Sequence, residues 1–130
     1  MIMEALTCLA LNIYHEARNQ PLDGKIAVAY VVLNRVESPK FPDDICSVIY
    51  QGVNKGKHKC QFSWACDGKS DKPYEKEAWV DSRVIAAFVL TLDVEDPTKG
   101  STHYHTIKST PYWRKHLEET RRIQDHVFYK

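Results

Sequence analysis

This 130-residue chain has neither an excess of charge of one sign nor a long run of apolar residues. Lysine and arginine total 18 against 17 acidic residues, so the formal net charge is only +1. This balance gives no strong attraction for nucleic acid or for anionic membranes. The longest apolar stretch, residues 26–33, is far shorter than the roughly 18 residues that a membrane span requires. We therefore expect no nucleic-acid partner and no stable membrane association.

A secretory signal is also missing from the sequence. The first residues lack the basic region, the apolar core and the small-residue cleavage site that such signals contain. The sequence therefore predicts a protein that is made in the cytoplasm without a signal peptide. Four cysteines are present, Cys8, Cys46, Cys60 and Cys66, and a cytosolic origin favours free thiols over disulfides.

Helical periodicity is the clearest pattern that the sequence does contain. Apolar residues recur at three- and four-residue spacing over residues 3–17 and again over residues 74–92, which predicts two amphipathic helices. The first should end near Arg18, because Asn19-Gln20-Pro21 combines turn-forming residues with a proline. Residues 23–36 are apolar on every face and predict a central helix, with Asp23 as a candidate N-cap. A buried strand is the competing interpretation of this valine-rich run.

The rest of the chain predicts shorter features. Asp43 or Asp44 is a candidate cap for a short helix. Residues 52–73 contain many turn-forming residues and predict an irregular lobe with at most a small hairpin. Later in the chain we expect an extended stretch, a helical turn and a second extended stretch, at residues 102–106, 111–113 and 126–129. Residues 1–130 thus predict one mostly α domain of the α+β class with a small irregular β lobe.

Glu16 is the first candidate for chemistry. Counting back along a helix places Ile13 and Leu9 on the same face, so this carboxyl group should pack toward the core. Burial raises the pKa of a carboxyl group and keeps it protonated near neutral pH, as a general acid for glycosidic cleavage requires. An ordinary ion pair of Glu16 with Arg18 or Lys25 is the alternative that spacing leaves open.

Metal sites fit the sequence poorly. The stretch His15-Glu16-Ala17-Arg18-Asn19 departs from the zinc-protease pattern at Asn19, where a second histidine is needed. The spacing of Cys60 and Cys66 does not match a structural zinc site either. We expect no metal and no cofactor, and interpret the remaining candidates as packing or substrate-contact residues, namely His58, Cys60, Cys66, His103 and His105.

Aromatic residues gather outside the long predicted helices. They are Phe62, Trp64, Tyr104, Tyr112, Trp113, Phe128 and Tyr129. Sugar rings have apolar faces edged by hydroxyl groups, so aromatic side chains beside polar ones suit a glycan-binding cleft. For Trp64 and Trp113, which stand in loop-rich polar surroundings, core packing and sugar contact both remain open.

Four blocks of sequence follow one another in an order typical of a known family. The first is Ile13-Tyr14-His15-Glu16-Ala17-Arg18 with the apolar segment after it, and the others are Gln61-Phe62-Ser63-Trp64, then Thr102-His103-Tyr104-His105 with Pro111-Tyr112-Trp113, and finally His126-Val127-Phe128-Tyr129. In these blocks the chain resembles the spore cortex-lytic enzyme and cell wall hydrolase family. The resemblance implies a compact, mostly helical catalytic domain related to goose-type lysozyme.

The resemblance also implies roles for individual residues. Glu16 aligns with the catalytic glutamate of the family. The other blocks align with residues that line its glycan groove, which assigns substrate binding to Arg18, Gln61, Phe62, Ser63, Trp64, Tyr104, His105, Trp113 and His126. In this assignment Tyr104, Ser63 and Gln61 orient hydroxyl or N-acetyl groups. Arg18 meets the lactyl carboxylate or an attached peptide.

Two positions depart from the family pattern, which commonly reads Glu-Ala-Arg-Gly-Glu. Asn19-Gln20 replaces the final Gly-Glu, and Gln124-Asp125 fills a turn that often holds glycine. Most glycosidases use a second carboxylate as base or nucleophile. Asp67 is the best remaining candidate for that role, although Asp67-Gly68 reads more simply as a turn.

A lone carboxyl group suffices for a lytic transglycosylase, because the 6-hydroxyl of N-acetylmuramic acid acts as an internal nucleophile. The sequence therefore predicts cleavage between N-acetylmuramic acid and N-acetylglucosamine with 1,6-anhydro products, and Glu16 as both acid and base. A hydrolytic muramidase and a non-catalytic wall-binding module are the alternatives. The expected partner is bacterial peptidoglycan. A monomeric wall-degrading domain without a signal peptide looks like a phage endolysin that reaches the wall after holin-type release.

Overall fold

The computed structural model describes residues 2–130 and contains a group of four helices beside a small sheet. The helices are α1 (Ile2–Ala17), α2 (Leu22–Glu37), α3 (Ile45–Ile49) and α4 (Lys76–Thr91), and the strands are β1 (His103–Thr106), β2 (Glu119–Ile123) and β3 (His126–Tyr129). Three short 3-10 helices, η1 (Val53–Lys55), η2 (Ser63–Cys66) and η3 (Tyr112–His116), complete the structure. The predicted fold class, mostly α with a small β part, is confirmed.

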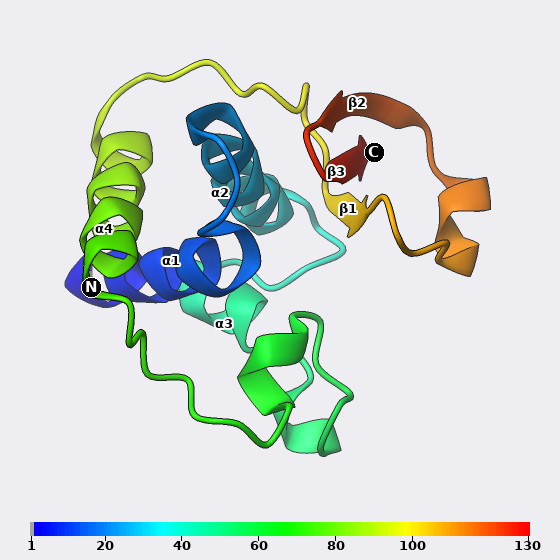
Figure 1. Ribbon diagram of the computed structural model, residues 1–130. Helices are drawn as coiled ribbons and strands as arrows, with labels where there is room; N and C mark the ends of the chain where they lie inside the picture. Colours follow the sequence, from blue (N-terminus) through cyan, green and yellow to red (C-terminus); the bar gives the residue numbers. More distant parts are fainter. Residues whose placement is uncertain (1) are drawn as a thin grey trace.

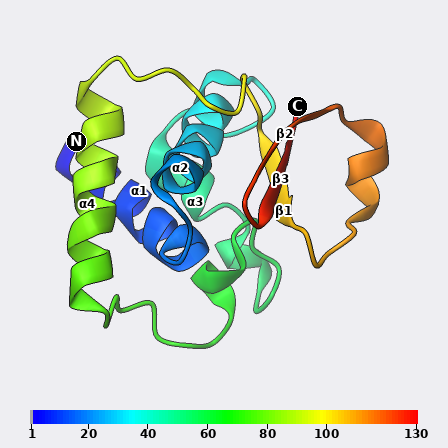
Figure 2. The same cartoon turned by 45° about the horizontal axis from the view of Figure 1, so that its top comes forward.

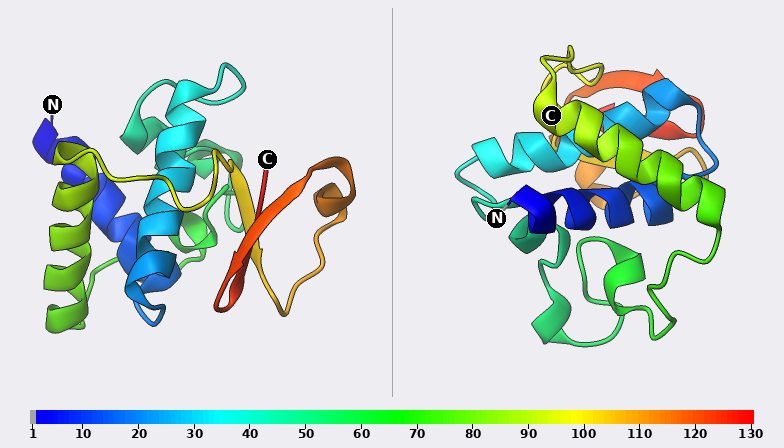
Figure 3. Two further views of the ribbon diagram at one scale, coloured as in Figure 1. Left: turned by 90° about the horizontal axis from the view of Figure 1, so that it is seen from above. Right: turned by 90° about the vertical axis from the view of Figure 1, so that its left-hand side faces the viewer.

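The elements are arranged around α1 and α2. Helix α1 contacts each of the other three helices. Figure 1 shows α4 on one side of α2 and the sheet on the other, and Figure 2 shows the same order from a tilted view. The irregular segment of residues 50–73, here called the loop lobe, hangs below α1 and α3 (Figure 1). The left view of Figure 3 shows η3 beyond the sheet, at the far end from α4.

The core forms where the helical spacing predicted it. Leu9 and Ile13 of α1 are fully buried, as are Ala29 and Val32 of α2. Helix α2 starts one residue earlier than predicted: Pro21 occupies the N-cap position, and Asp23 lies in the first turn. There the carboxylate of Asp23 favours the helix through the positive end of the helix dipole rather than through a cap hydrogen bond.

Two loop predictions are also settled. Asp44, rather than Asp43, caps α3: its Oδ1 accepts a hydrogen bond of 2.9 Å from the backbone N–H of Ser47. The loop lobe contains only the short helices η1 and η2, and no strand occurs within residues 50–73. The expected irregular lobe is therefore present without a hairpin.

The sheet is antiparallel with the strand order β1-β3-β2, so β3 lies in the centre. All four residues of β3 are buried. Strand β2 was not predicted from the sequence. This edge strand exposes Glu119, Arg121 and Arg122 and buries only Ile123, so it lacks an apolar pattern. Charged residues are typical of exposed edge strands, where they discourage pairing with other chains.

Strand alternation divides the sheet residues between two faces. Tyr104 pairs with Phe128 and Thr106 with His126, so these side chains share one face. This face packs on α2, where Phe128 forms a buried cluster with Ala27 and Val31 and contacts Tyr104. The other face carries His103 and His105 of β1.

The prediction of free thiols is wrong. Cys8 in α1 is bonded to Cys46 in α3, and Cys60 is bonded to Cys66 within the loop lobe. The first bond links residues 38 positions apart, and their proximity follows from the packing of α1 on α3. The cellular compartment alone indicates neither the packing of these helices nor the closure of the loop.

Among the described residues, no helix is both long enough and apolar enough to cross a lipid bilayer.

Candidate active site

Glu16 lies in the last turn of α1 and is partly buried. Leu9 and Ile13 below it are fully buried, as the helical spacing predicted. The hydroxyl of Tyr104, from β1, donates a hydrogen bond to Oε1 of Glu16. The cations that could have formed an ordinary ion pair with Glu16 have other partners: Arg18 pairs with Glu75, and Lys25 pairs with Asp81 at 2.7 Å.

The surroundings of Glu16 act on its pKa in opposite directions. Burial raises the pKa of this carboxyl group, and burial is the largest effect. The hydrogen bond from Tyr104 and the positive charge of Arg35 both lower it. Burial and the neighbouring Glu16 raise the pKa of Tyr104 well above its ordinary value, so the phenol keeps its proton and remains a donor.

Arg35 of α2 brings a buried positive charge to this site, with only 5% of its surface exposed. Its Nε donates to the carbonyl of Thr102 at 2.8 Å, and its Nη1 donates to Oε1 of Gln61 at 3.4 Å. The guanidinium also lies over the rings of Phe41 and Phe62, at 4.7 and 5.2 Å from their centres. Arg35 thus connects α2, the loop lobe and the start of β1 behind Glu16.

A cleft of about 340 Å³ opens beside Glu16. Its lining comes from the end of α1, the turn before α2, the end of β1 with the loop after it, and the β2–β3 turn with the start of β3. The lining residues are Glu16, Gln20, Thr106, Ile107, Lys108, Asp125 and His126. A concave site with a carboxyl group of raised pKa and several polar side chains is the usual form of an enzyme active site.

His126 is buried at the edge of this cleft. Its ring packs edge-on against the ring of Tyr104, with 5.0 Å between their centres. Burial lowers the pKa of His126, which favours the neutral imidazole. Its Nδ1 has no hydrogen-bond partner among the described residues. The structure therefore brings together Glu16, Tyr104 and His126 from the sequence-based site.

His105 and Trp113 lie on the opposite face of the sheet. The Nε2 of His105 hydrogen-bonds the hydroxyl of Tyr129 at 2.8 Å, and the two rings stack. The ring of Trp113 packs against Tyr129 at 5.3 Å and against His103 at 5.0 Å. Because adjacent residues of a strand point to opposite faces, Tyr104 and His105 cannot both face Glu16.

Phe62 and Trp64 belong to the main core, while Gln61 and Ser63 beside them are exposed. The indole Nε1 of Trp64 donates to Oδ1 of the buried Asn12 at 2.8 Å. Trp64 therefore packs in the core, which is one of the two interpretations that the sequence left open. Gln61 accepts a hydrogen bond from the guanidinium of Arg35, whose positive charge acts on Glu16.

Arg18 and the residues before it hold the segment that leads into α4. Besides the ion pair of Arg18 with Glu75, the Nε2 of His15 donates to the carbonyl of Asp71 at 2.8 Å. The hydroxyl of Tyr14 accepts the backbone N–H of Glu75 at 3.0 Å. These contacts fasten the end of the loop lobe and the residue before α4 to the end of α1. Substrate binding by Arg18 stays a prediction.

Three charged residues near Glu16 were not among the site residues predicted from the sequence, namely Arg35, Lys108 and Asp125. Arg35 looked only like the polar end of an apolar helix, and nothing in the chain order places Asp125 near Glu16. The proposed second carboxylate, Asp67, lies instead in the loop lobe. Its Oδ1 accepts the backbone N–H of Lys69 at 2.9 Å, which is the turn interpretation of Asp67-Gly68.

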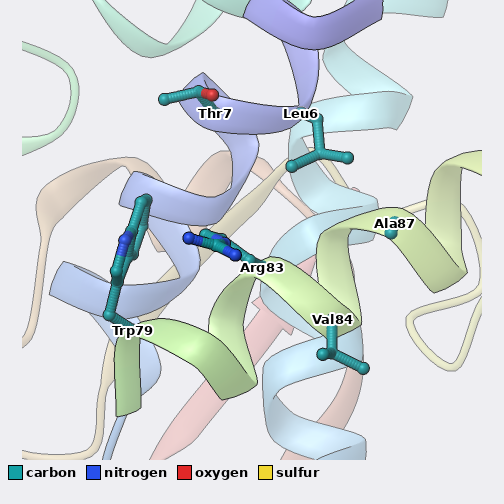
Figure 4. Close-up of a pocket in the computed structure, with 6 residues that line it drawn as sticks. All are labelled: Leu6, Thr7, Trp79, Arg83, Val84 and Ala87. Carbon is teal, nitrogen blue, oxygen red and sulfur yellow. The ribbon is translucent and has the colours of Figure 1, made fainter. Parts of the chain in front are cut away.

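A second hollow, of about 500 Å³, lies between the first half of α1 and one side of α4 (Figure 4). Figure 4 shows its lining, which is Leu6, Thr7, Trp79, Arg83, Val84 and Ala87. This lining contains no carboxyl group that could donate a proton. The cleft beside Glu16 is therefore the better candidate for catalysis.

Curated proteins are similar to this chain in sequence. The spore cortex-lytic enzyme of Halalkalibacterium halodurans is 31% identical over 121 residues, which are 92% of this chain and 33% of that protein. The enzyme of the same name from Bacillus subtilis is 30% identical over 124 residues, 92% of this chain and 35% of that protein. The chain thus spans about a third of the length of the curated relatives it matches.

A solved structure agrees over almost the whole chain. The catalytic domain of the germination-specific lytic transglycosylase SleB from Bacillus anthracis superposes with a TM-score of 0.72 and 27% identity, covering 97% of this chain and 93% of that one. The sequence profile of the cell wall hydrolase family matches residues 19–129, a range that starts after Glu16. The chain therefore belongs to the cell wall hydrolase family.

Proposed function

We propose that this chain cleaves the glycan strands of bacterial peptidoglycan between N-acetylmuramic acid and N-acetylglucosamine, as a lytic transglycosylase. One observation carries the proposal: the carboxyl group of Glu16 lines a cleft, accepts a hydrogen bond from Tyr104 and has a raised pKa. The likeness to a domain named as a lytic transglycosylase supports it. Membership in the cell wall hydrolase family supports peptidoglycan as the substrate.

The reaction proceeds in two proton transfers. The protonated carboxyl group of Glu16 gives its proton to the glycosidic oxygen, the bond from C1 of N-acetylmuramic acid to that oxygen breaks, and N-acetylglucosamine leaves with a free 4-hydroxyl. The 6-hydroxyl of N-acetylmuramic acid then attacks C1, and the carboxylate of Glu16 accepts the hydroxyl proton. The product carries a 1,6-anhydro bond, and Glu16 ends in its starting state.

Tyr104 and Arg35 are placed to stabilise the Glu16 carboxylate between the two proton transfers. Both lower the pKa of Glu16, which means that both stabilise the carboxylate. Burial favours the acid before the first transfer. These opposed effects keep Glu16 able to lose a proton and to regain it, as a group that acts as acid and base requires.

The cleavage products test this function. Mass spectrometry of digested peptidoglycan should show 1,6-anhydromuramic acid ends, and Glu16→Gln should abolish their formation. Reducing muramic acid ends without anhydro products would instead identify a hydrolytic muramidase. Wall binding without loss of turbidity, unchanged by Glu16→Gln, would identify a non-catalytic binding module.

The biological setting stays a prediction. A role in phage-induced lysis requires that the protein reach the wall through a lesion in the membrane. Expression in host cells with and without a hole-forming membrane protein tests it, because only the combined expression should lyse the cells. The monomeric state likewise stays a prediction, which light scattering of the purified protein would check.

A further inference from the structure

Asp125 places a second carboxylate in the cleft that contains Glu16. It stands in the turn between β2 and β3 and lines the cleft together with Gln20 from the turn after α1. The side chain of Gln20 meets Asp125 twice. Its Nε2 donates to Oδ2 of Asp125 at 3.2 Å, and its Oε1 accepts the backbone N–H of Asp125 at 3.4 Å. We call this pair of hydrogen bonds the Gln20–Asp125 clamp.

The backbone at this turn is held in an uncommon conformation. Gln124 has a φ of 51°, in the left-handed region that favours glycine. The carbonyl of Asp125 accepts the backbone N–H of Ile107 at 2.9 Å, which ties the turn to the loop after β1. A strained residue persists only where its surroundings fix it, and such residues cluster at functional sites. The Gln20–Asp125 clamp and the hydrogen bond from Ile107 to Asp125 hold Gln124 in this conformation.

The clamp leaves part of the Asp125 carboxylate free. Oδ2 accepts the amide of Gln20, whereas no hydrogen bond from the described residues reaches Oδ1. A carboxylate oxygen accepts hydrogen bonds and donates none, so it selects for ligand groups with O–H or N–H donors. Sugar hydroxyls and the acetamido N–H are such donors, and a hydrogen bond to a charged acceptor is stronger than a neutral one.

We propose that Asp125 binds the glycan substrate directly, by accepting a hydrogen bond from a sugar hydroxyl or acetamido N–H next to the bond that Glu16 cleaves. Gln20 is a positioning residue that holds the carboxylate toward the cleft. This inference rests on the proposed function for its substrate. It assigns Asp125 to binding, and it leaves proton transfer to Glu16.

Steady-state kinetics on purified, uncrosslinked glycan strands tests the role of Asp125. Asp125→Asn keeps the size of the side chain and an oxygen for Gln20 but removes the charge. We expect KM to rise about tenfold while kcat changes less than twofold, because a charge-assisted hydrogen bond is lost from binding. Asp43→Asn, an exposed carboxylate before α3, is the matched control and should leave KM unchanged. An unchanged KM in Asp125→Asn overturns the proposal.

The double variant Gln20→Glu with Asp125→Asn separates substrate contact from a purely structural role. It exchanges the carboxylate and the amide while conserving both side-chain lengths, so the clamp can re-form. We expect the double variant to have the wild-type Tm and to keep the raised KM of Asp125→Asn, because the carboxylate now belongs to residue 20 rather than to residue 125. Recovery of the wild-type KM would show that the clamp acts only on structure and would overturn the substrate contact.

A binding measurement keeps this test independent of turnover. In the Glu16→Gln background, calorimetry with glycan strands should show that Asp125→Asn raises Kd about tenfold. An unchanged Kd overturns the role of Asp125 even if the protein is an active transglycosylase. Conversely, undiminished activity of Glu16→Gln overturns the proposed mechanism, and the KM of Asp125→Asn then decides the role of Asp125.

Discussion

The hydroxyl of Tyr104 donates a hydrogen bond to Oε1 of Glu16 across 88 positions of sequence. This contact joins the strand β1 to the last turn of α1. It works against the burial of Glu16, because a donor stabilises the carboxylate whereas burial stabilises the acid. The balance between the two therefore decides over which pH range Glu16 holds its proton.

Tyr104→Phe should shift the pH–rate profile to higher pH. Without the donor, the pKa of Glu16 rises further, so the protonated acid survives to a higher pH and the descending limb of kcat/KM moves upward. The carboxylate left after the first proton transfer loses its hydrogen bond, and kcat should fall roughly 10- to 100-fold. Rates on soluble glycan strands from pH 4 to pH 9 give both values. Tyr112→Phe, at a residue that is 80% exposed, is the matched control. A descending limb that stays in place in Tyr104→Phe contradicts the prediction.

Glu16→Gln should make the folded protein more stable relative to wild type as the pH rises. The pKa of Glu16 is raised in the fold above 4.5, so above pH 4.5 the unfolded chain loses this proton first and the free energy of unfolding of the wild type falls. Glutamine has no proton to lose. The difference between variant and wild type should therefore grow from pH 4.5 until folded Glu16 is also ionised, and then remain constant. Urea denaturation at pH 4, 5, 6 and 7 measures it, and a constant difference would contradict the raised pKa.

Much of the helical fold could be predicted from spacing. In α1 the fully buried Leu9 and Ile13 are four positions apart, and this helical interval can be read from the sequence. Strand β2 escaped prediction because its stability comes from pairing with β3 rather than from its own apolar residues. The pairing of Cys8 with Cys46 likewise depends on how α1 meets α3.

The site was predictable only in part, for the same reason. The partial burial of Glu16 follows from its own helix, because Ile13 and Leu9 on the same face are fully buried. Arg35 is held in place by hydrogen bonds to Thr102 and Gln61, which lie 67 and 26 positions from it in the sequence. Such long-range contacts leave no periodic signal in the sequence, so neither the charge of Arg35 nor the carboxylate of Asp125 could be placed beside Glu16.

His103 should make the protein less stable as the pH falls from 6.5 toward 4. Burial, with the positive charges of Arg35 and Lys40, lowers the pKa of His103 to about 4. Between pH 4 and pH 6.5 the unfolded chain therefore binds a proton that the folded protein does not, and the free energy of unfolding drops with falling pH. His103→Gln should reduce this slope, although His126, whose pKa is also lowered, keeps part of it. Urea denaturation at pH 4.5, 5.5 and 6.5 measures the slope, and an equal slope in both proteins contradicts the prediction.

The two disulfides should differ in their contribution to stability. A disulfide stabilises the fold mainly by restricting the unfolded chain, and the effect grows with the length of the closed loop. The Cys8–Cys46 bond closes a sequence separation of 38 and the Cys60–Cys66 bond a separation of 6. The expected contributions are about 4 and about 2 kcal/mol, respectively.

Urea denaturation of the oxidised protein can separate the two bonds. The double variant Cys8→Ser with Cys46→Ser should lower the free energy of unfolding more than Cys60→Ser with Cys66→Ser. Excess reductant is the control, because it should bring the wild type close to the variant that lacks all four cysteines. Loss of the shorter bond should still lower kcat/KM, since its loop carries Gln61, which accepts a hydrogen bond from Arg35 behind Glu16. If the shorter bond contributed more to the free energy of unfolding, its effect would have to come from the folded loop lobe rather than from the unfolded chain.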